Sequence, residues 1–520
     1  MVLDITQSKD CVDVSYVTDS NRIEVENIIF DDEVINVNGE KYIRQFHNFV
    51  ECLDNDPNRN QKLISFYGKP IKLEPSKRFT HHNLNYFLNY EIPTFYPKQK
   101  ELFGKLNIPD PFSFDIETDI TDEHGYSSEE NPENPIRSMS FTDINLNTLL
   151  FIVKNPDHSE FNDLDYGYIR NILQEALGKH YHDYDYEFKI RIFDTESEML
   201  NYFIDCNLKY FHMIIGWNVL KYDFRYFIGR CEKLGLDWKR SSPVRKFVNN
   251  RIEINEANHV DIKVPAHRLY IDYMQIFKES LVYNNLGKYN LDSIAEKVLG
   301  LHKVSYSGNL RTLYETDYLR FVGYALVDTI IVMLIHKITN LIGIDFFNSY
   351  YTGCPYVKLG QNAISEALVY NELMNDNIFL LESECSTLPI RPFKGGYVKD
   401  PTAKIVGGVA GYDFGSLYPN SMLTVGCSPE SKIDILHCGP DGFPDNPKDQ
   451  EKWEKYKKLG YCLSPFGRVY DVSKDFLFTR IEKKLLAERK TYRRFEDDIY
   501  LNIMPIIEAE AKRRELKLED

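Results

Sequence analysis

The sequence lacks the features that would assign it to a membrane, to an oxidising compartment or to a zinc-binding class. Its 520 residues contain no uninterrupted apolar run of membrane-spanning length, and the opening MVLDITQSKDCVDV lacks the basic and apolar plan of a signal peptide. The nine cysteines are odd in number, scattered and without a CxxC pair, which argues against a disulfide framework and a zinc site. These absences predict a cytoplasmic, intracellular protein with reduced cysteines and no membrane partner.

Positive charge is also scarce overall. A net charge of −16 would by itself argue against nucleic acid as a partner, because phosphate binding draws on Lys and Arg. Residues 477–494 are the exception, since they hold seven basic residues against two acidic ones. Such a focused segment indicates an anion-binding site, and a solvated helix face with ion pairs is the alternative.

The length predicts about three or four domains. Short strand-like runs alternate with polar turns before residue 110. After it, the apolar segments PFSFDIET and MIIGWNVL are typical of strands that end in acidic or amide residues at a sheet edge. Helical patterns follow at residues 291–301 and 317–338, and the second is apolar on most faces and therefore expected to be buried. The pattern as a whole predicts a mixed α/β, multidomain fold.

Three acidic motifs, FDIET, NVLKYDF and YALVD, lie on these elements. Asp115 and Glu117 alternate along a strand and therefore share one face. Asp223 follows an apolar strand at the start of an expected helix. Tyr324 and Asp328 are four residues apart on a helix, so they also share a face. Each pattern is common alone, but their order and spacing together indicate a single site.

Carboxylate oxygens of this kind select Mg²⁺ or Mn²⁺. Two such ions, about 3.5–4 Å apart, stabilise the attacking and leaving oxygens of an in-line phosphoryl displacement. The motifs therefore predict a nuclease with two ions per active site. In that site Tyr324 would orient the water nucleophile or help to deprotonate it.

A fourth acidic motif, YDFGSLYPNSM, follows further along the chain. VGGVAGYDF is expected to form a strand that delivers Asp413 to a sheet edge. GSLYPN is expected to begin a helix with Pro419 in its first turn, where a missing N–H costs nothing. The backbone N–H groups of Ser416 and Leu417 would then face a triphosphate.

These motifs, in this order, resemble those of the family B DNA polymerases in the T-even bacteriophage group. FDIET, GWNVLKYDF and YALVD resemble the three exonuclease motifs, in the subtype with tyrosine in the third, and RIFDTESEML, YIDYMQIF and YNLDSIAEKVLG support the match. The resemblance implies an RNase H-like 3′→5′ exonuclease domain. It implies that Asp115, Glu117, Asp223 and Asp328 hold the metals and that Tyr324 assists the nucleophile.

The resemblance also implies contacts to DNA. Phe114 and Asn218 would touch the primer end, with capping of the next helix as the alternative for Asn218. FKGGYV resembles an element near the template strand, with Phe393 in place of its usual tyrosine. Gly395 and Gly396 there would let the backbone approach phosphate closely, and a plain β-turn is the competing explanation.

YDFGSLYPNSM resembles polymerase motif A. By that resemblance Asp413 is a ligand of both polymerase metals, with the Phe414 carbonyl beside it, and Tyr418 is the steric gate against a ribose 2′-hydroxyl. The segment LAERKTYRR resembles the first helix of the fingers. Its Arg489 and Arg493, four residues apart, would then reach the triphosphate of the incoming dNTP.

The resemblance implies four parts: an N-terminal domain at 1–109 completed by 340–383, the exonuclease at 110–339, and the first parts of the palm at 384–468 and of the fingers at 469–520. The second fingers motif and the second polymerase aspartate are absent from the 520 residues. We therefore expect the N-terminal portion of a split polymerase, which proofreads alone and needs a C-terminal polymerase subunit for synthesis; a truncated chain fits equally well. Primer–template DNA, single-stranded 3′ ends and dNTPs are expected partners, with a sliding clamp as a further candidate. A free-standing exonuclease and a non-catalytic DNA-binding scaffold are the alternatives.

Overall fold

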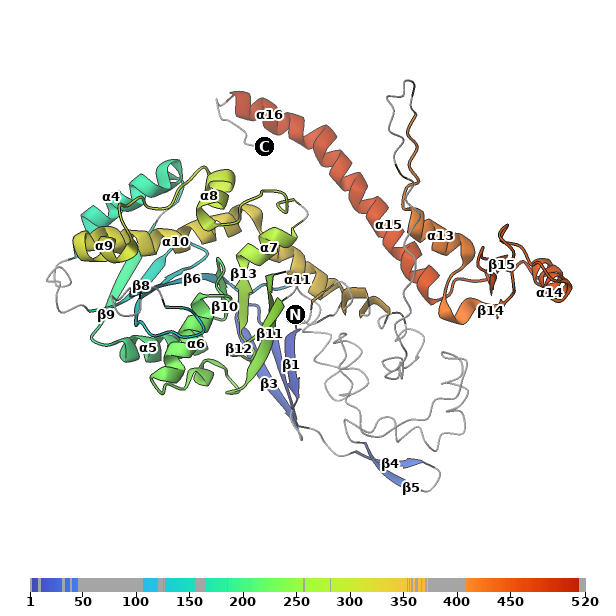
Figure 1. Ribbon diagram of the computed structural model, residues 1–520, viewed down its shortest axis with the longest axis horizontal. Coiled ribbons are helices and arrows are strands. Elements are labelled where there is room, and N and C mark those ends of the chain that lie inside the picture. Colours follow the sequence, from blue (N-terminus) through green and yellow to red (C-terminus); the bar gives the residue numbers. More distant parts are fainter. Residues whose placement is uncertain are drawn as a thin grey trace. The chain divides into compact units, whose positions relative to one another are not determined.

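The computed structural model describes residues 2–44, 106–154, 164–372 and 400–513, each range with short gaps. Contacts divide the chain into two compact units, Met1–Asp31 with Phe87–Ile364 and Asp32–Tyr86 with Ser365–Asp520 (Figure 1). This division does not follow the domain boundaries expected from the sequence, which stay a prediction.

The first unit is built on a six-stranded mixed sheet with the order β13-β10-β6-β7-β8-β9. The strands are β6 (Pro111–Thr118), β7 (Ile136–Thr142), β8 (Thr148–Val153), β9 (Phe188–Phe193), β10 (Met213–Gly216) and β13 (Leu269–Asp272). β10 is parallel to β6 and β13, β7 is antiparallel to both neighbours, and β8 is parallel to β9. The expected strands in the first two acidic regions are confirmed.

Helices cover both faces of this sheet (Figure 1). They are α4 (Tyr166–Leu177), η4 (Gly178–His182), α5 (Glu196–Lys209), α6 (Asp223–Lys233), η5 (Trp238–Ser241), α7 (Tyr273–Glu279), α8 (Leu291–Leu299), α9 (Leu310–Thr316), α10 (Tyr318–Thr339) and α11 (Leu341–Thr352). One apolar core joins α4, α8, α9 and α10 to the sheet, and a second joins α5 and α6 to it. Successive strand residues, such as Ile214 and Ile215, alternate between the two cores, so these lie on opposite faces.

The central helix of the unit is α10, which packs on β6, β7 and β8 and against α4, α8 and α9. It begins at an Asp317 cap, whose side chain accepts the Arg320 N–H at 3.1 Å, and ends at Asn340 in the left-handed conformation. It is long and apolar enough to cross a membrane, but 83% of its most apolar window is buried inside the unit. The expected buried helix is thus confirmed, and it carries the third acidic motif into the core.

Strands β1 (Val2–Gln7), β2 (Cys11–Val17) and β3 (Ile23–Ile29) form an antiparallel sheet in the first unit, and β11 (Phe247–Asn255) and β12 (Asn258–Pro265) form a hairpin. The N–H of Ile23 donates to Nδ1 of His212 at 2.7 Å. Lys246 forms an ion pair with Asp13 at 2.7 Å. These contacts attach the small sheet to the body of the unit.

The second unit contains the hairpin β4 (Glu33–Val37) and β5 (Glu40–Arg44), followed later in the chain by α13 (Leu417–Val425), η8 (Pro429–Ser431), β14 (Lys432–Ile435), α14 (Pro447–Lys458), β15 (Cys462–Leu463), β16 (Arg468–Tyr470), α15 (Leu477–Asp498), the π turn η9 (Ile499–Ile503) and α16 (Met504–Arg513). Strand β16 pairs antiparallel with β14 and β15. Helix α13 packs against α15. The basic segment at 477–494 is therefore helical.

Candidate active site

Strand β6 and helix α10 bring three carboxylates together. Asp115 and Glu117 come from one face of β6, Asp328 comes from α10, and one oxygen of each lies within 4.8 Å of the others. Glu117 is 8% exposed and Asp328 is 2% exposed. The first and third motifs therefore converge as predicted.

The second motif completes the cluster from α6. Asp223 is the first residue of that helix, where unpaired backbone N–H groups favour a negative charge. Its carboxylate also accepts the N–H of Ile116 at 3.2 Å, so it lies against the backbone between Asp115 and Glu117. All four predicted exonuclease carboxylates thus belong to one buried site.

Burial and mutual repulsion raise the pKa values of these carboxyl groups. Burial, and then the charge of Asp328, raise the pKa of Asp115 to about 7. Burial, and then Asp115, raise the pKa of Glu117 and that of Asp223 well above their usual ranges. Without cations, such a site favours bound protons, because neutral carboxyl groups neither repel each other nor require hydration.

Lys303 supplies positive charge to the site, although no sequence motif singled it out. Its Nζ lies 2.6 Å from Oδ2 of Asp328 and donates to the Tyr324 hydroxyl at 2.9 Å. Burial acts to lower the pKa of Lys303, but the charges of Asp328 and Asp115 outweigh burial and hold this pKa above its usual range. Lys303 lies in an irregular segment after α8, outside the acidic motifs of the sequence. Its place in the site follows only from its contacts with Asp328 and Tyr324.

The donor atoms of this site fit divalent cations. Every candidate ligand is a carboxylate oxygen, which is the donor that Mg²⁺ and Mn²⁺ prefer. Oδ1 of Asp328 is buried and has no hydrogen-bond partner among the described residues. A single lysine balances only part of the charge of four ionised carboxylates. The unpartnered oxygen and the surplus negative charge both favour binding of metal ions here.

The Tyr324 hydroxyl accepts a hydrogen bond from Nζ of Lys303, the same atom that pairs with Asp328. Burial, and then the charge of Asp328, raise the pKa of Tyr324 above its usual range. The phenol therefore stays neutral at ordinary pH. Both roles predicted for Tyr324, orienting the nucleophile and helping to remove its proton, stay predictions.

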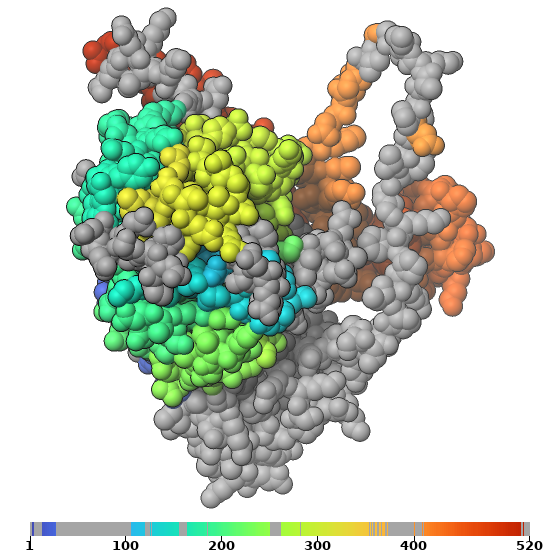
Figure 2. Space-filling model, turned by 60° about the vertical axis from the view of Figure 1, so that its left-hand side comes forward, coloured from blue at the N-terminus to red at the C-terminus, as the bar shows by residue number. Residues whose placement is uncertain are grey.

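A cavity of about 590 Å³ opens beside the carboxylates. The surfaces of the residues near 110 (cyan) and near 300 (yellow) are neighbours in Figure 2. The cavity is lined by Asp115, Trp217, Asn218, Met274, Lys278, Tyr289, Asn290, Leu291 and Lys303. The indole N–H of Trp217 donates to the Tyr289 carbonyl at 2.8 Å, which fixes one aromatic wall. Aromatic walls and a nearby lysine suit a stacked base and its phosphate.

Asn218 lines this cavity in the left-handed conformation, with φ at +63°. Its backbone N–H donates to Oδ1 of Asp272 at 3.1 Å. Helix α6 is capped at Tyr222 without a side-chain hydrogen bond, so the capping role considered for Asn218 is not found. The placement of Asn218 agrees with the predicted contact to a DNA end, which stays a prediction.

Asp272, at the end of β13, is a second residue that sequence analysis did not single out. It caps α7 by accepting the Gln275 N–H, and it also holds the turn at Asn218. Burial raises the pKa of Asp272 to about 6, although several backbone N–H donors oppose that shift. In the sequence, Asp272 stands three residues before Gln275, which is the spacing of a helix cap. That spacing does not reveal the contact between Asp272 and Asn218.

Phe114 occupies a different position from the one its predicted role requires. Its side chain is 1% exposed and stacks on Phe141 and Phe203, with ring centroids 5.2 and 5.4 Å apart. Alternation along β6 turns it away from the face of Asp115 and Glu117. The predicted contact between this side chain and a DNA end does not fit its burial, and we assign Phe114 to the core.

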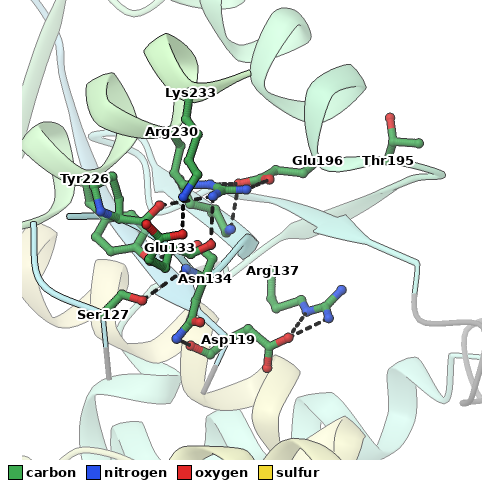
Figure 3. A network of polar contacts seen from close by, with 12 residues as sticks. Asp119, Ser127, Glu133, Asn134, Arg137, Thr195, Glu196, Tyr226, Arg230 and Lys233 are labelled. Carbon is green, nitrogen blue, oxygen red and sulfur yellow. Dashed lines mark hydrogen bonds and ion pairs between the residues drawn. The ribbon is translucent and has the colours of Figure 1, made fainter. Parts of the chain in front are cut away.

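Figure 3 shows a polar network around Arg230, a residue of the helix that begins with Asp223. Arg230 of α6 donates to Glu196 of α5 at 2.9 Å and to the carbonyl of Pro132 at 3.0 Å. Glu196 also accepts the Ile136 N–H at 2.8 Å, where β7 begins. Both charged side chains are nearly buried, at 8% and 10% exposed. The network therefore joins the start of β7 to the helix that begins with Asp223.

The residues predicted for DNA synthesis belong to the second unit. Asp413 is exposed, and Phe414 and Tyr418 are each 76% exposed. Ser416 and Leu417 begin α13 with Pro419 in its first turn, as expected. The strand expected to deliver Asp413 is not found at 410–414, where the described residues are irregular and have no strand partner.

Other polymerase predictions are only partly located. Arg489 and Arg493 lie exposed on α15, the helix against which α13 packs. Phe393, Gly395 and Gly396 lie outside the described residues. Among the described residues, the one group of carboxylates close enough to share a metal is that of the first unit. The polymerase roles therefore stay predictions.

Comparison with known proteins agrees with the geometry of the first unit. Residues 72–294 match the family described as DNA polymerase family B, exonuclease domain. The matched segment is therefore similar to the family B exonuclease domain, which is RNase H-like and whose family uses divalent metals. The family resemblance of the three acidic motifs is confirmed.

Individual relatives are DNA polymerases. The chain is 24% identical to the DNA-directed DNA polymerase of Enterobacteria phage T4 and 26% identical to that of Escherichia phage RB69, over 58% of this chain in each case. It is 25% identical to the DNA polymerase of Pyrococcus horikoshii over 42% of this chain. The match spans 33% of each phage polymerase and 18% of the archaeal one.

Proposed function

We propose that this chain is a 3′→5′ proofreading exonuclease that hydrolyses the terminal phosphodiester of single-stranded DNA ends. The observation that carries the proposal is the buried cluster of Asp115, Glu117 and Asp328 at the edge of the cavity. Two bound Mg²⁺ or Mn²⁺ ions would supply Lewis-acid stabilisation of the attacking and leaving oxygens. Asp115, Glu117, Asp223 and Asp328 are the residues that would hold them.

The remaining side chains bind and orient. Trp217 and Tyr289 provide apolar walls for the terminal base, and Asn218 offers an amide beside it. The neutral Tyr324 hydroxyl orients the water that attacks the phosphorus, and Lys303 neutralises negative charge near the phosphate. Because the aromatic walls contact any base, we expect little sequence preference.

The test is hydrolysis of a 5′-labelled single-stranded oligonucleotide by the purified chain. Stepwise shortening from the 3′ end is expected with Mg²⁺ and not with EDTA. Asp115→Ala combined with Glu117→Ala should abolish it, whereas the matched double change Asp194→Ala with Glu198→Ala, at exposed carboxylates, should retain it. Full activity of the first double variant would contradict the proposal. DNA binding without cleavage by the unaltered chain would favour the scaffold alternative.

For synthesis, we propose that Asp413 is a metal ligand of a polymerase site that needs motifs from another polypeptide. Support comes from the order of sequence motifs and from the polymerases that the chain resembles. Primer extension that requires both this chain and a polypeptide carrying those motifs, and that Asp413→Ala abolishes, is the expected result. Exonuclease activity without extension in that mixture would favour a free-standing exonuclease. The clamp and the intracellular location stay predictions.

A further inference from the structure

Two cations line the cavity of the first unit, Lys278 and Lys303. Lys303 is engaged with the carboxylates, because its Nζ lies 2.6 Å from Oδ2 of Asp328. Lys278 is exposed, and no carboxylate among the described residues lies within ion-pair distance of it. Its Nζ lies 6.0 Å from the centre of the Tyr289 ring, one of the proposed walls for a base. In a chain with a net charge of −16, the cavity thus presents one cation that no described carboxylate neutralises.

Helix α7 fixes the place of Lys278 at the cavity. Two aromatic residues of this short helix, Tyr273 and Phe277, are completely buried. The Tyr273 hydroxyl lies 3.0 Å from Nδ1 of His336, and the Phe277 ring contacts that of Trp217, with centroids 5.5 Å apart. Lys278 follows Phe277 directly and turns to the surface. Because the backbone is anchored by its buried face, only the end of the lysine side chain has to be ordered when an anion binds.

Lys278 and the metal-site carboxylates come from different walls of the cavity. Asp115 and Asp328 are carried by β6 and α10, whereas Lys278 is carried by α7, which follows the edge strand β13 (Figure 1). Strand β10 lies between β13 and β6 in the sheet. In the proposed function the scissile phosphate lies at the metals, between the carboxylates. A cation on another wall of the same cavity is therefore placed for a neighbouring phosphate.

The polarity of the substrate determines which phosphate that is. The nucleotide released from a 3′ end carries the scissile phosphate on its 5′ side and ends in a hydroxyl on its 3′ side. The scissile phosphate therefore has one neighbour, the second phosphate from the 3′ end.

We propose that Lys278 binds the second phosphate from the 3′ end of a single DNA strand. The inference rests on the proposed exonuclease function and adds a substrate contact that no sequence motif singled out. Lysine recognises phosphate as a point charge and does not read the base, which agrees with the aromatic walls of the cavity. Because the contact lies away from the reacting atoms, it stabilises the bound substrate and the transition state equally. It should therefore lower KM and leave kcat unchanged.

The test combines a change in the protein with a change in the substrate. Release of the first nucleotide is measured in Mg²⁺ from two oligonucleotides, one natural and one with a neutral methylphosphonate at the second phosphate from the 3′ end. Lys278→Met should raise KM for the natural oligonucleotide about tenfold at unchanged kcat. The methylphosphonate should raise KM of the unaltered chain by a similar factor. The two changes together should cause no further increase, because each removes the same contact.

Salt dependence gives an independent measure of the contact. For the natural oligonucleotide, the slope of log KM against log salt concentration should fall by ~0.7 in Lys278→Met, because one phosphate fewer is neutralised. Lys278→Arg keeps the charge and should retain the low KM. Lys189→Met, at an exposed lysine of β9 on the opposite edge of the sheet, is the matched control and should change neither KM nor the methylphosphonate effect. Thermal unfolding would establish that each variant is folded.

An unchanged KM in Lys278→Met overturns the proposal, and so do effects of the two changes that simply multiply. A lower kcat at unchanged KM would place Lys278 at the chemical step and also overturns it. Coupling to a methylphosphonate at the third phosphate instead overturns the assigned position.

Failure of the exonuclease proposal is distinguishable from failure of this one. If the unaltered chain does not hydrolyse DNA, the exonuclease proposal fails. The same four combinations of protein and oligonucleotide are then compared by fluorescence anisotropy in EDTA, where hydrolysis plays no part. Coupling between Lys278 and the second phosphate in that assay supports the contact, and its absence overturns the contact.

Discussion

Replacing Asp115 by asparagine should change the stability of the metal-free protein in a pH-dependent way. The pKa of Asp115 is about 7 in the folded chain, against 3.8 for the unperturbed group. The folded state therefore holds this proton more tightly than the unfolded state does. Stability from that proton is fully present below pH ~4 and is lost as the pH rises through about 7. The asparagine side chain of the variant stays neutral at every pH, so the variant does not lose this stability as the pH rises.

The size of the effect follows from the shift. About three pKa units correspond to ~4 kcal/mol when the group is fully shielded from water. Asp115 is only partly buried and borders an open cavity, so solvent screening reduces the figure and we expect ~2 kcal/mol. For a unit of about 300 residues, that amounts to ~3 °C in Tm.

Thermal unfolding of the full chain in EDTA, at pH 5 and pH 8, measures the difference. Asp115→Asn should melt ~3 °C higher than the unaltered chain at pH 8, and higher by less than half of that difference at pH 5, where the carboxyl of the unfolded chain is already ionised. Asp194→Asn, at a side chain that is 79% exposed, is the control and should show no difference at either pH. Adding Mg²⁺ should stabilise the unaltered chain more than Asp115→Asn. An equal difference at both pH values, or a less stable variant at pH 8, would refute the assigned environment of Asp115.

Three further substitutions have defined outcomes. Tyr324→Phe should retain Mg²⁺ binding, measured by the Tm shift, but lower single-turnover hydrolysis about ten- to hundredfold by removing the orienting hydroxyl. Lys303→Met should destabilise the metal-free chain by ~2–4 kcal/mol in urea unfolding, because Asp328 loses its ion pair, and Mg²⁺ should reduce that loss. Glu196→Gln should cost ~3–5 kcal/mol in the same assay, because the nearly buried Arg230 loses the charge of its carboxylate partner. The exposed Glu198→Gln should cost little, and equal effects would contradict the role of the network.

The parts of the site that lie on regular elements could be predicted from the sequence. Alternation puts Asp115 and Glu117 on one face of a strand, and a four-residue spacing does the same for Tyr324 and Asp328 on a helix. These rules concern one element at a time. That β6 and α10 meet, although some two hundred residues separate them, was implied only by the family order of the motifs, and the structure confirms it.

The residues that were missed or misassigned depend on packing across elements. Lys303 follows α8 without a motif, and its role exists only because Asp328 lies beside it. Asp272 has the spacing of a helix cap, but its link to Asn218 crosses from β13 to the end of β10. Phe114 was assigned to a DNA contact by the family resemblance, whereas strand alternation turns its side chain to the opposite, buried face.

Two contacts of the protein itself hold the metal-free site in place. The backbone N–H of Ile116 fixes Asp223, and the pair of Arg230 and Glu196 fixes the helix behind it, and neither contact involves a metal. The carboxylates are therefore held in place while their charge is only partly balanced by Lys303. Binding of divalent cations then replaces protons rather than reorganising the fold, so metal affinity should rise with pH as the raised pKa values are passed. In the proposed function, the repulsion among four confined carboxylates would therefore favour metal binding.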